Sequence, residues 1–190
     1  MRDLILKMSI SIDGFVSDLD GANTWMFGAD QEVKAWVVET LWNASLHIMG
    51  SRTFHDMAAW WPASTDVFAP PMNQIPKAVF SRQGPAILGD LKRPGAGNWA
   101  DAYVASGSLA AEIARLKAQE GKPIIAHGGA TFARSLVAQG LVDQFALLVC
   151  PVALGKGLPL FSELAAPMSL ELMSSKAFPG GAVAQIYRAA

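Results

Sequence analysis

The sequence has little of several features that define common classes of protein. It contains one cysteine, so no disulfide can form within the chain, which suits a reducing cytoplasm. Charged residues make up 16% of the chain, the formal net charge is −1, and no basic stripe is present, which argues against a nucleic-acid surface. No apolar segment approaches the ~20 residues of a membrane span, and the N-terminus lacks a secretion signal. We therefore expect a cytoplasmic protein that binds neither nucleic acid nor membrane.

Histidine is also scarce, and its positions form no metal-binding pattern. His47 and His55 have no further ligands at a spacing typical of a zinc site, so we expect no metal. The single thiol, Cys150, lies in the apolar run 145–152 without a neighbouring His or Lys, and is expected to be buried rather than nucleophilic. Apolar residues are abundant, at 52% of the chain, which predicts a well-filled core. A length of 190 residues fits one domain.

Strand and helix patterns alternate along the chain. Strand patterns occupy residues 4–12, 46–49, 77–81, 103–105, 124–126, 142–152, 170–173 and 182–188. Helical patterns begin after Asp30, after Gly50 and after Gly129, and a further one occupies residues 106–120. Residues 18–28, 64–76 and 84–100 are predicted to be loops. This order predicts a single-domain α/β fold, with a mostly parallel central sheet, helices on both faces and antiparallel C-terminal strands.

The most informative segment is Ile124-Ile125-Ala126-His127-Gly128-Gly129-Ala130-Thr131-Phe132. A β-branched apolar run ends at two glycines, and a helical pattern follows. A strand–turn–helix unit of this kind presents free backbone N–H groups at the helix start, where the helix dipole favours an anion. Glycines also let phosphates approach without a Cβ in the way. A glycine pair alone is weak evidence, because many turns need one glycine only for its positive φ.

Two other predicted strands end in similar turns. The turn Gly50-Ser51-Arg52-Thr53 follows the strand at 46–49, and Ser81-Arg82 ends the strand at 77–81. In an open α/β sheet, the loops at the carboxyl ends of the strands converge on the ligand. The three turns together supply backbone donors, hydroxyl groups and two guanidinium groups, which suits a polyphosphate and can select a 2′-phosphate. Helix capping and solvated arginines explain any one turn as well, but explain the set of three poorly.

Several motifs occur in a fixed order along the chain. They are Met8-Ser9-Ile10-Ser11-Ile12-Asp13-Gly14-Phe15-Val16, Met49-Gly50-Ser51-Arg52-Thr53-Phe54, Gly128-Gly129-Ala130-Thr131-Phe132 and Leu154-Gly155-Lys156-Gly157. This ordered set resembles the C-terminal reductase domain of the bifunctional riboflavin-biosynthesis deaminase–reductase, which shares the dihydrofolate reductase fold. The likeness covers nearly the whole chain. The zinc deaminase half has no counterpart here, so the chain resembles a stand-alone reductase domain.

The resemblance implies a site for NADPH built from separate segments. Met8 and Ser9 would lie beside the nicotinamide, with Val16 and Ser17 on a mobile loop over it. The phosphates and the adenosine half would contact Gly50, Ser51, Arg52 and Thr53, and Ser81 and Arg82 would reach the 2′-phosphate. The pyrophosphate would be held by His127, Gly128, Gly129, Ala130, Thr131 and Phe132. Relatives often carry Arg directly after the first of these glycines, where this chain has Ser51; Arg52 and Arg82 are the available replacements.

Hydride transfer needs no protein nucleophile, only a nicotinamide held against an electron-poor carbon and a nearby source of a proton. In dihydrofolate reductases, a carboxylate on the first helix assists protonation. The resemblance makes Glu32 the candidate here, with Asp30 and Glu39 on the same predicted helix. Ordinary helix chemistry is a strong alternative, because Asp30 suits an N-cap and Glu32 a first-turn acid.

A slot for a planar substrate would need aromatic walls. The candidates are Trp25, Trp36, Phe54 and Trp61. Trp25 is the best of these because it lies in a predicted loop, whereas core packing explains Trp36 and Phe54 equally well.

Three functions remain open at this point. The first is an NADPH-dependent reductase of a pyrimidine- or pteridine-type substrate, resembling 5-amino-6-(5-phosphoribosylamino)uracil reductase. The second is a dihydrofolate reductase proper, and the third is a nucleotide-binding protein without turnover. Relatives commonly pair, so we expect a homodimer, to which the apolar run 145–152 could contribute.

Overall fold

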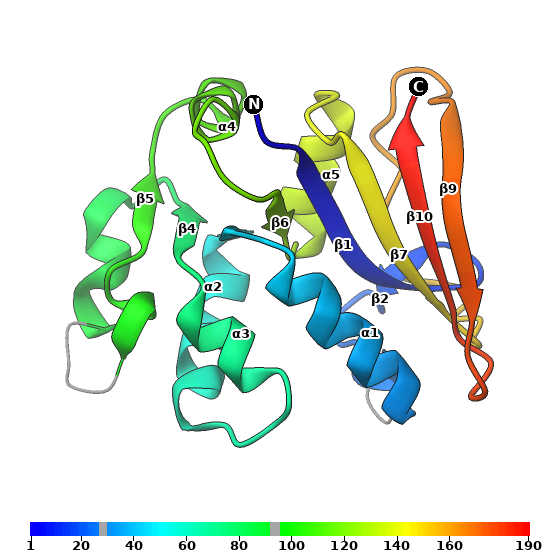
Figure 1. Ribbon diagram of the computed structural model, residues 1–190. Helices are drawn as coiled ribbons and strands as arrows, with labels where there is room; N and C mark the ends of the chain where they lie inside the picture. The colour runs from blue at the N-terminus through cyan, green and yellow to red at the C-terminus, as the bar shows by residue number, and fades with distance from the viewer. Residues whose placement is uncertain (27–29, 92–95) are drawn as a thin grey trace.

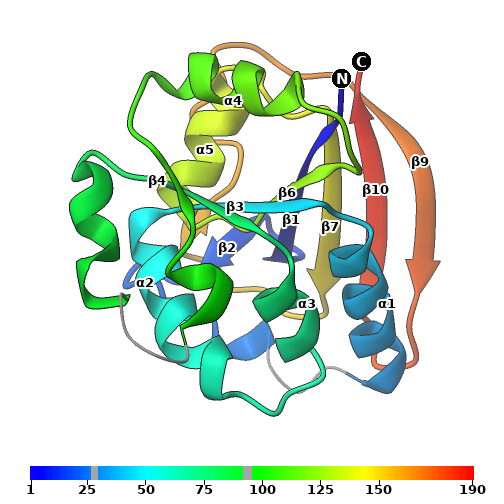
Figure 2. The same ribbon diagram turned by 60° about the vertical axis from the view of Figure 1, so that its left-hand side comes forward.

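In the computed structural model, which describes residues 1–26, 30–91 and 96–190, a large sheet lies between two layers of helices (Figures 1 and 2). The strands are β1 (Leu4–Ser11), β2 (Phe15–Ser17), β3 (Leu46–Gly50), β4 (Lys77–Phe80), β5 (Tyr103–Ala105), β6 (Ile124–Ala126), β7 (Gln144–Cys150), β8 (Leu158–Pro159), β9 (Leu170–Ala177) and β10 (Val183–Ala189). The α-helices are α1 (Gln31–Trp42), α2 (Ser51–Trp60), α3 (Ala69–Gln74), α4 (Leu109–Lys117) and α5 (Ala130–Ala138).

The sheet has the order β5-β4-β3-β6-β1-β7-β10-β9. The first six strands in this order run parallel, and β10 and β9 are antiparallel to their neighbours. The short strands β2 and β8 form a separate antiparallel pair. The predicted α/β fold, with a mostly parallel sheet and antiparallel C-terminal strands, is therefore confirmed.

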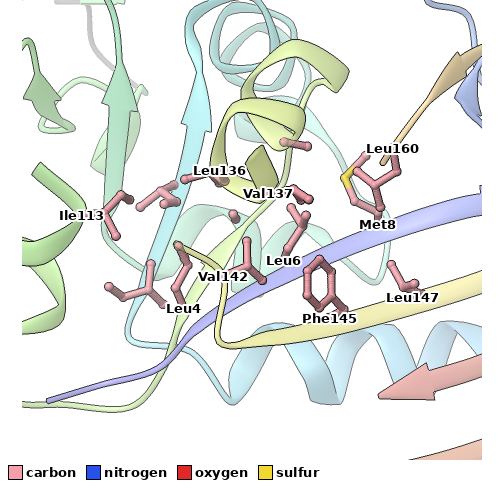
Figure 3. Close-up of a cluster of buried hydrophobic side chains, with 14 of the residues drawn as sticks. Leu4, Leu6, Met8, Ile113, Leu136, Val137, Val142, Phe145, Leu147 and Leu160 are labelled. Carbon is pink, nitrogen blue, oxygen red and sulfur yellow. The ribbon is translucent and has the colours of Figure 1, made fainter. Parts of the chain in front are cut away.

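The sheet separates two hydrophobic cores because side chains along a strand alternate between its faces. On one face, Leu4, Leu6 and Met8 of β1 pack with residues of α4 and α5, as Figure 3 shows for Leu136 and Val137. The opposite face packs against α1, α2 and α3, through residues that include Val33, Val37, Leu41, Phe54 and Met72. The odd-numbered positions of β1 face this second side, which we call the α1 face.

Several local predictions differ from the structure. Residues 69–74, within a predicted loop, form α3, because Pro70 and Pro71 occupy a first helical turn, where the missing N–H costs nothing. The predicted first strand ends at Ser11, and Ile12 is exposed. The predicted loop 84–100 contains 3₁₀ turns at Gly84–Leu91 and Gly97–Trp99. Residues 92–95 of that loop, and residues 27 and 28 of the predicted loop 18–28, lie outside the described residues.

Strand β7 lies in the interior of the sheet, between β1 and β10. Phe145, Leu147 and Leu148 are buried there, so packing within the sheet and its cores accounts for the apolar character of the run. Cys150 is buried as predicted, and burial raises the pKa of its thiol. In the parts of the chain that the structure describes, the longest helix is α1 with 12 residues, too short to cross a membrane.

Candidate cofactor and substrate site

The three turns predicted to bind a cofactor lie side by side at one end of the sheet. Strands β4, β3 and β6 are consecutive in the sheet, so the turns that follow them are neighbours. The Gly50 amide donates a hydrogen bond to the Gly128 carbonyl oxygen at 3.3 Å. The Ser81 amide is tied to the end of β5, where it donates to the Ala105 carbonyl oxygen at 3.1 Å. The convergence predicted from the strand ends is therefore confirmed.

Two of these turns begin helices whose N-termini lack side-chain caps. Gly50 precedes α2 and Gly129 precedes α5, and neither position offers a side-chain acceptor to the first-turn amides. In α1 and α4, by contrast, Asp30 and Ser108 accept hydrogen bonds from first-turn amides at 2.8 Å and 3.4 Å. Free amides and two helix dipoles at adjacent strand ends provide a binding place for an anion such as a pyrophosphate.

Glycine allows these two helix starts to pack closely. A Cβ on Gly50 would lie 3.1 Å from the Phe132 Cβ, and a Cβ on Gly129 would lie 3.0 Å from the Thr53 Oγ1. A larger residue at either position would push α2 and α5 apart. Gly128 has a φ of +84°, in the region that favours glycine, and its peptide bond to Gly129 is cis. The shape of the turn therefore depends on all three glycines.

Two residues predicted to contact the cofactor use their side chains for packing. Met8 is buried in the core beneath α5, where Figure 3 shows it beside Leu160. Phe132 packs on Phe80 with ring centroids 5.0 Å apart. The Met8 side chain nevertheless reaches the glycine turn, because a Cβ on Gly128 would lie 3.0 Å from its Sδ.

Both predicted arginines lie at this end of the sheet. Arg52 is in the first turn of α2, Arg82 directly follows Ser81, and both side chains are exposed. Neither forms an ion pair with any residue in the described ranges. Exposed guanidinium groups beside free helix N-termini are suited to phosphate groups. Ser51, Ala130 and Thr131 occupy the same first turns and add backbone N–H groups.

Val16 and Ser17, predicted to lie on a mobile loop, form strand β2 and are buried. The Asp13 carboxylate fastens the turn before β2 to the segment before β8. It accepts hydrogen bonds from the Ser11 Oγ at 2.6 Å and from the Gly155 amide at 2.7 Å. These hydrogen bonds lower the pKa of Asp13 to about 2. The segment beside the end of β1 is therefore held in place by a carboxylate that stays ionised.

The four predicted aromatic residues all pack on the core of the α1 face. Phe54 is fully buried, with its ring centroid 5.7 Å from that of Trp99. Helical spacing placed it in the core, so the prediction of a substrate contact is wrong for Phe54. Trp36 and Trp61 are half-buried. Trp25 is half-buried too, and its enclosed Nε1 has no hydrogen-bond partner among the described residues.

Glu32 lies at the surface, beside the edge strand β9. Its side chain is 58% exposed, and its carboxylate is 3.7 Å from the Lys176 Nζ on β9. Asp30 caps α1, and Glu39 is exposed. The Glu32 carboxylate is therefore a solvent-exposed, first-turn acid of the kind that suits the helix dipole, and its role as a proton donor stays a prediction.

Basic side chains, not acidic ones, lie under α1. Four of them form a diagonal line across the α1 face, which we call the basic row: Lys7 on β1, His127 after β6, His47 on β3 and Lys77 on β4. Lys7 and His127 directly follow the register pair Leu6 and Ala126, and His47 is paired with Lys77. The rings of His127 and His47 contact each other, with centroids 4.7 Å apart. None of the four forms an ion pair with a carboxylate of the described chain.

Burial lowers the pKa of every member of the basic row. Desolvation lowers the pKa of Lys7 to about 8 and that of Lys77 to about 7. Desolvation, and then the charge of Lys77, lowers the pKa of His47 to about 3. The pKa of His127 is held well below its usual value by desolvation and by the charges of the other three. Near neutral pH both imidazoles are therefore uncharged, whereas the two lysines lie close to their midpoints.

Three members of the basic row were missed by reasoning from the sequence. A signal existed for Lys7, which is the one charged residue in an otherwise apolar or hydroxyl-bearing strand. His47 also lies in an apolar strand, but the sequence reasoning considered its spacing to His55 only as evidence for or against a metal site. Among the described residues, no group of three or more His, Cys, Asp or Glu is arranged to hold a metal. Lys77 gives no local signal, because a lysine that begins a strand is usually solvated.

Comparisons with known proteins agree with this architecture. Residues 2–184 match the family described as the RibD C-terminal domain. The uncharacterized protein YyaP of Bacillus subtilis is 25% identical over 98% of this chain and 94% of its own length. A putative riboflavin biosynthesis protein from Shewanella sp. PV-4 superposes with a TM-score of 0.72 at 20% identity, covering 100% of this chain and 99% of that one. Dihydrofolate reductase from Enterococcus faecalis, complexed with NADP(H), superposes with a TM-score of 0.61 at 13% identity, covering 98% and 96%. The chain therefore belongs to the RibD C-terminal domain family and has the dihydrofolate reductase-like fold.

Proposed function

We propose that this protein is an NADPH-dependent reductase that transfers a hydride to a pyrimidine-type substrate. The observation that carries the proposal is the pair of uncapped helix N-termini at adjacent strand ends, with Gly128 and Gly129 between them. The pyrophosphate would lie against these amides, and Arg82 and Ser81 would face the 2′-phosphate. The nicotinamide would then extend toward the backbone of Met8 and Ser9 and toward β2.

The α1 face favours a substrate rich in carbonyl oxygens. A pterin ring presents donors and gains a proton when bound to a carboxylate, but no described carboxylate of α1 faces the sheet. Lys7 and His127 present nitrogen groups there instead, and an ammonium is a hydrogen-bond donor only. An aminouracil ring offers the oxygens that such donors need. This contrast favours an aminouracil ribosylamino phosphate, as in the riboflavin pathway, over dihydrofolate.

Different residues would hold the cofactor and donate the proton in the proposed reaction. When bound, NADPH supplies the hydride. The glycine turn and the two helix starts hold the phosphates and so fix the position of the nicotinamide. Lys7 points to the face on which the substrate would lie, and its ammonium can donate the proton that accompanies the hydride. Trp25 offers a further donor at the same side of the sheet.

A binding and turnover experiment tests this function. NADPH should raise the melting temperature progressively with its concentration, because at a hundred times Kd it adds about 2.7 kcal/mol to the free energy of unfolding. NADH should raise the melting temperature less, because it lacks the 2′-phosphate. NADPH absorbance should then decline with the aminouracil ribosylamino phosphate and remain constant with dihydrofolate. Stabilisation by NADPH without oxidation by either compound would favour a nucleotide-binding protein without turnover. The absence of any stabilisation by NADPH would refute the proposal.

We also propose that the protein forms a homodimer, through the sheet edge at β9 and not through β7. Seven of the eight residues of β9 are exposed, and they include Leu172 and Met173 at 52% and 51%. An exposed edge strand with apolar side chains is a template for pairing with a second copy. We expect light scattering to give a dimer mass for the wild type and a monomer mass for Leu172→Glu. An unaltered mass in this variant would contradict the interface.

A further inference from the structure

Asp13 joins two segments of the chain that lie 141 residues apart in the sequence. Its carboxylate accepts hydrogen bonds from the Ser11 hydroxyl at 2.6 Å, from the Gly155 amide at 2.7 Å and from the Leu154 amide at 3.1 Å. We call these four residues the Asp13 cluster. The turn after β1 also closes through its own backbone, because the Gly14 amide donates to the Ser11 carbonyl oxygen at 3.0 Å. The hydrogen bonds from Leu154 and Gly155 therefore do more than shape this turn.

The Asp13 cluster is connected to strand β2. Ser11 is fully buried, and its hydroxyl accepts a hydrogen bond at 3.0 Å from the amide of Phe15, the first residue of β2. Strand β2 has three residues and its partner β8 has two, and a strand pair this short is marginal by itself. A Cβ on Gly157 would lie 2.3 Å from the Ser17 carbonyl oxygen, so the two segments are in close contact. Asp13 therefore helps to fix β2 and β8 relative to the end of β1.

The Asp13 cluster lies at the carboxyl ends of β1 and β7. Ser11 pairs with Cys150 at the last position of both strands, and the Ile12 amide donates to the Val152 carbonyl oxygen at 2.9 Å. Strand β6, which ends at the glycine turn, is the other neighbour of β1 and runs parallel to it. In the proposed function the pyrophosphate lies on that turn and the nicotinamide extends toward β2. Strand β2 would then form one wall of the nicotinamide site.

The charge of Asp13 strengthens the link between the two segments. The hydrogen bond from Ser11, and then that from Gly155, lower the pKa of Asp13 to about 2, so the carboxylate is ionised near neutral pH. Hydrogen bonds to an ionised acceptor are stronger than those between neutral groups. Asparagine has a similar shape but one carbonyl oxygen and no charge, so it can keep only part of these bonds, whereas alanine keeps none. Asp13 is exposed, so neither change leaves a cavity.

We propose that Asp13 is a positioning residue for hydride transfer, which holds β2 and β8 as a fixed wall beside the nicotinamide. This inference rests on the proposed function. The turns proposed to bind the phosphates have a contact of their own, because the Gly50 amide donates to the Gly128 carbonyl oxygen. Loss of the wall should therefore leave most of the cofactor affinity but release the nicotinamide ring. A displacement of about 1 Å between reacting groups can lower the rate about a hundredfold.

A comparison of rate with affinity tests this role. In Asp13→Ala, single-turnover hydride transfer from bound NADPH to the aminouracil ribosylamino phosphate should be about a hundredfold slower than in the wild type. The Kd for NADPH should rise by about threefold at most, and Asp13→Asn should recover part of the rate. Stopped-flow absorbance and fluorescence titration provide the two measurements. Asp66→Ala is the matched control and should equal the wild type in both, because the exposed Asp66 carboxylate accepts a backbone hydrogen bond, from Phe68, within its own turn.

A second measurement needs no substrate. The reduced nicotinamide is fluorescent, and the fluorescence anisotropy of bound NADPH reports how firmly its ring is held. At saturating NADPH the anisotropy should be lower in Asp13→Ala and in Ser11→Ala than in the wild type, whereas a merely structural role would lower the melting temperature without this change. Melting curves identify any variant that fails to fold, and the remaining variants of the Asp13 cluster then decide.

The possible failures are distinct. If the wild type does not bind NADPH, the proposed function fails, and the positioning role fails with it. If the wild type binds NADPH but rate and anisotropy are unaltered in the folded variants, the cofactor site stands and the positioning role is refuted. A rise in Kd as large as the loss of rate refutes it equally, because Asp13 would then support binding of the whole cofactor. If NADPH binds without being oxidised, the anisotropy alone decides.

Discussion

Lys7→Met should lower kcat by roughly 10²- to 10⁴-fold, the usual contribution of a positioned proton donor. Methionine keeps the length and packing of the side chain but cannot donate a proton. The turns proposed to bind the phosphates follow β3, β4 and β6, away from Lys7, so the Kd for NADPH should change by about twofold at most. Wild-type kcat should decline as pH rises past about 8, where Lys7 loses its proton. Steady-state kinetics over a pH series, with NADPH fluorescence titrations, provide both measurements.

The companion variant Glu32→Gln makes this test decisive. The sequence suggests Glu32 as the proton donor, whereas the structure places its carboxylate in solvent beside Lys176. The structure therefore predicts that Glu32→Gln retains kcat within about twofold, since exposed ion pairs contribute little. A large loss of kcat in Glu32→Gln, with activity retained in Lys7→Met, would reverse the assignment.

Lys77→Met should stabilise the protein at low pH. The pKa of Lys77 is about 7 in the folded protein against a usual value of 10.5. The unfolded chain therefore binds more protons between these values, and the wild type loses stability as pH falls from about 10.5 to 7. At 1.36 kcal/mol for each pH unit, the loss approaches roughly 5 kcal/mol below pH 7. The hydrogen bond from the Lys77 Nζ to the Ile75 carbonyl oxygen and the contact with the Trp99 ring offset part of the gain in the variant, so we expect a net increase of about 2–4 kcal/mol.

Urea unfolding at about pH 6 and about pH 10.5 measures this effect. The difference in the free energy of unfolding between Lys77→Met and the wild type should be large at the lower pH and nearly absent at the higher one. Lys34→Met is the control, and its difference should not vary with pH in this way. A variant that is less stable than the wild type at pH 6 would show that Lys77 is not destabilised by its burial.

The convergence of the three turns could be predicted because it depends on local order. A strand followed by a glycine turn and a helix can be recognised from a short segment, and parallel strands place all such turns at one end of a sheet. Gly50, Ser81 and Gly128 therefore came together as predicted. The direction of the Phe54 side chain could not be predicted in this way, because periodicity alone does not say which face of a helix meets a ligand.

The substrate side depends on register between strands that are distant in the chain. Lys7 and His127 are neighbours because β1 pairs with β6, and Lys77 joins them because β3 pairs with β4. No local pattern contains these pairings. Helix α3 was missed for a different reason, because a run of prolines argues for a loop unless it falls in a first helical turn.

The division of the molecule into two cores has a consequence for how new specificities arise on this scaffold. Leu4, Leu6 and Met8 anchor the α5 layer, whereas the intervening odd-numbered positions of β1 face the layer where the substrate would bind. Recognition can thus drift or be redesigned at Lys7 and Ser9 while the opposite layer keeps its packing. The even-numbered positions of β1 are therefore constrained by packing, whereas its odd-numbered positions are free to change with the ligand.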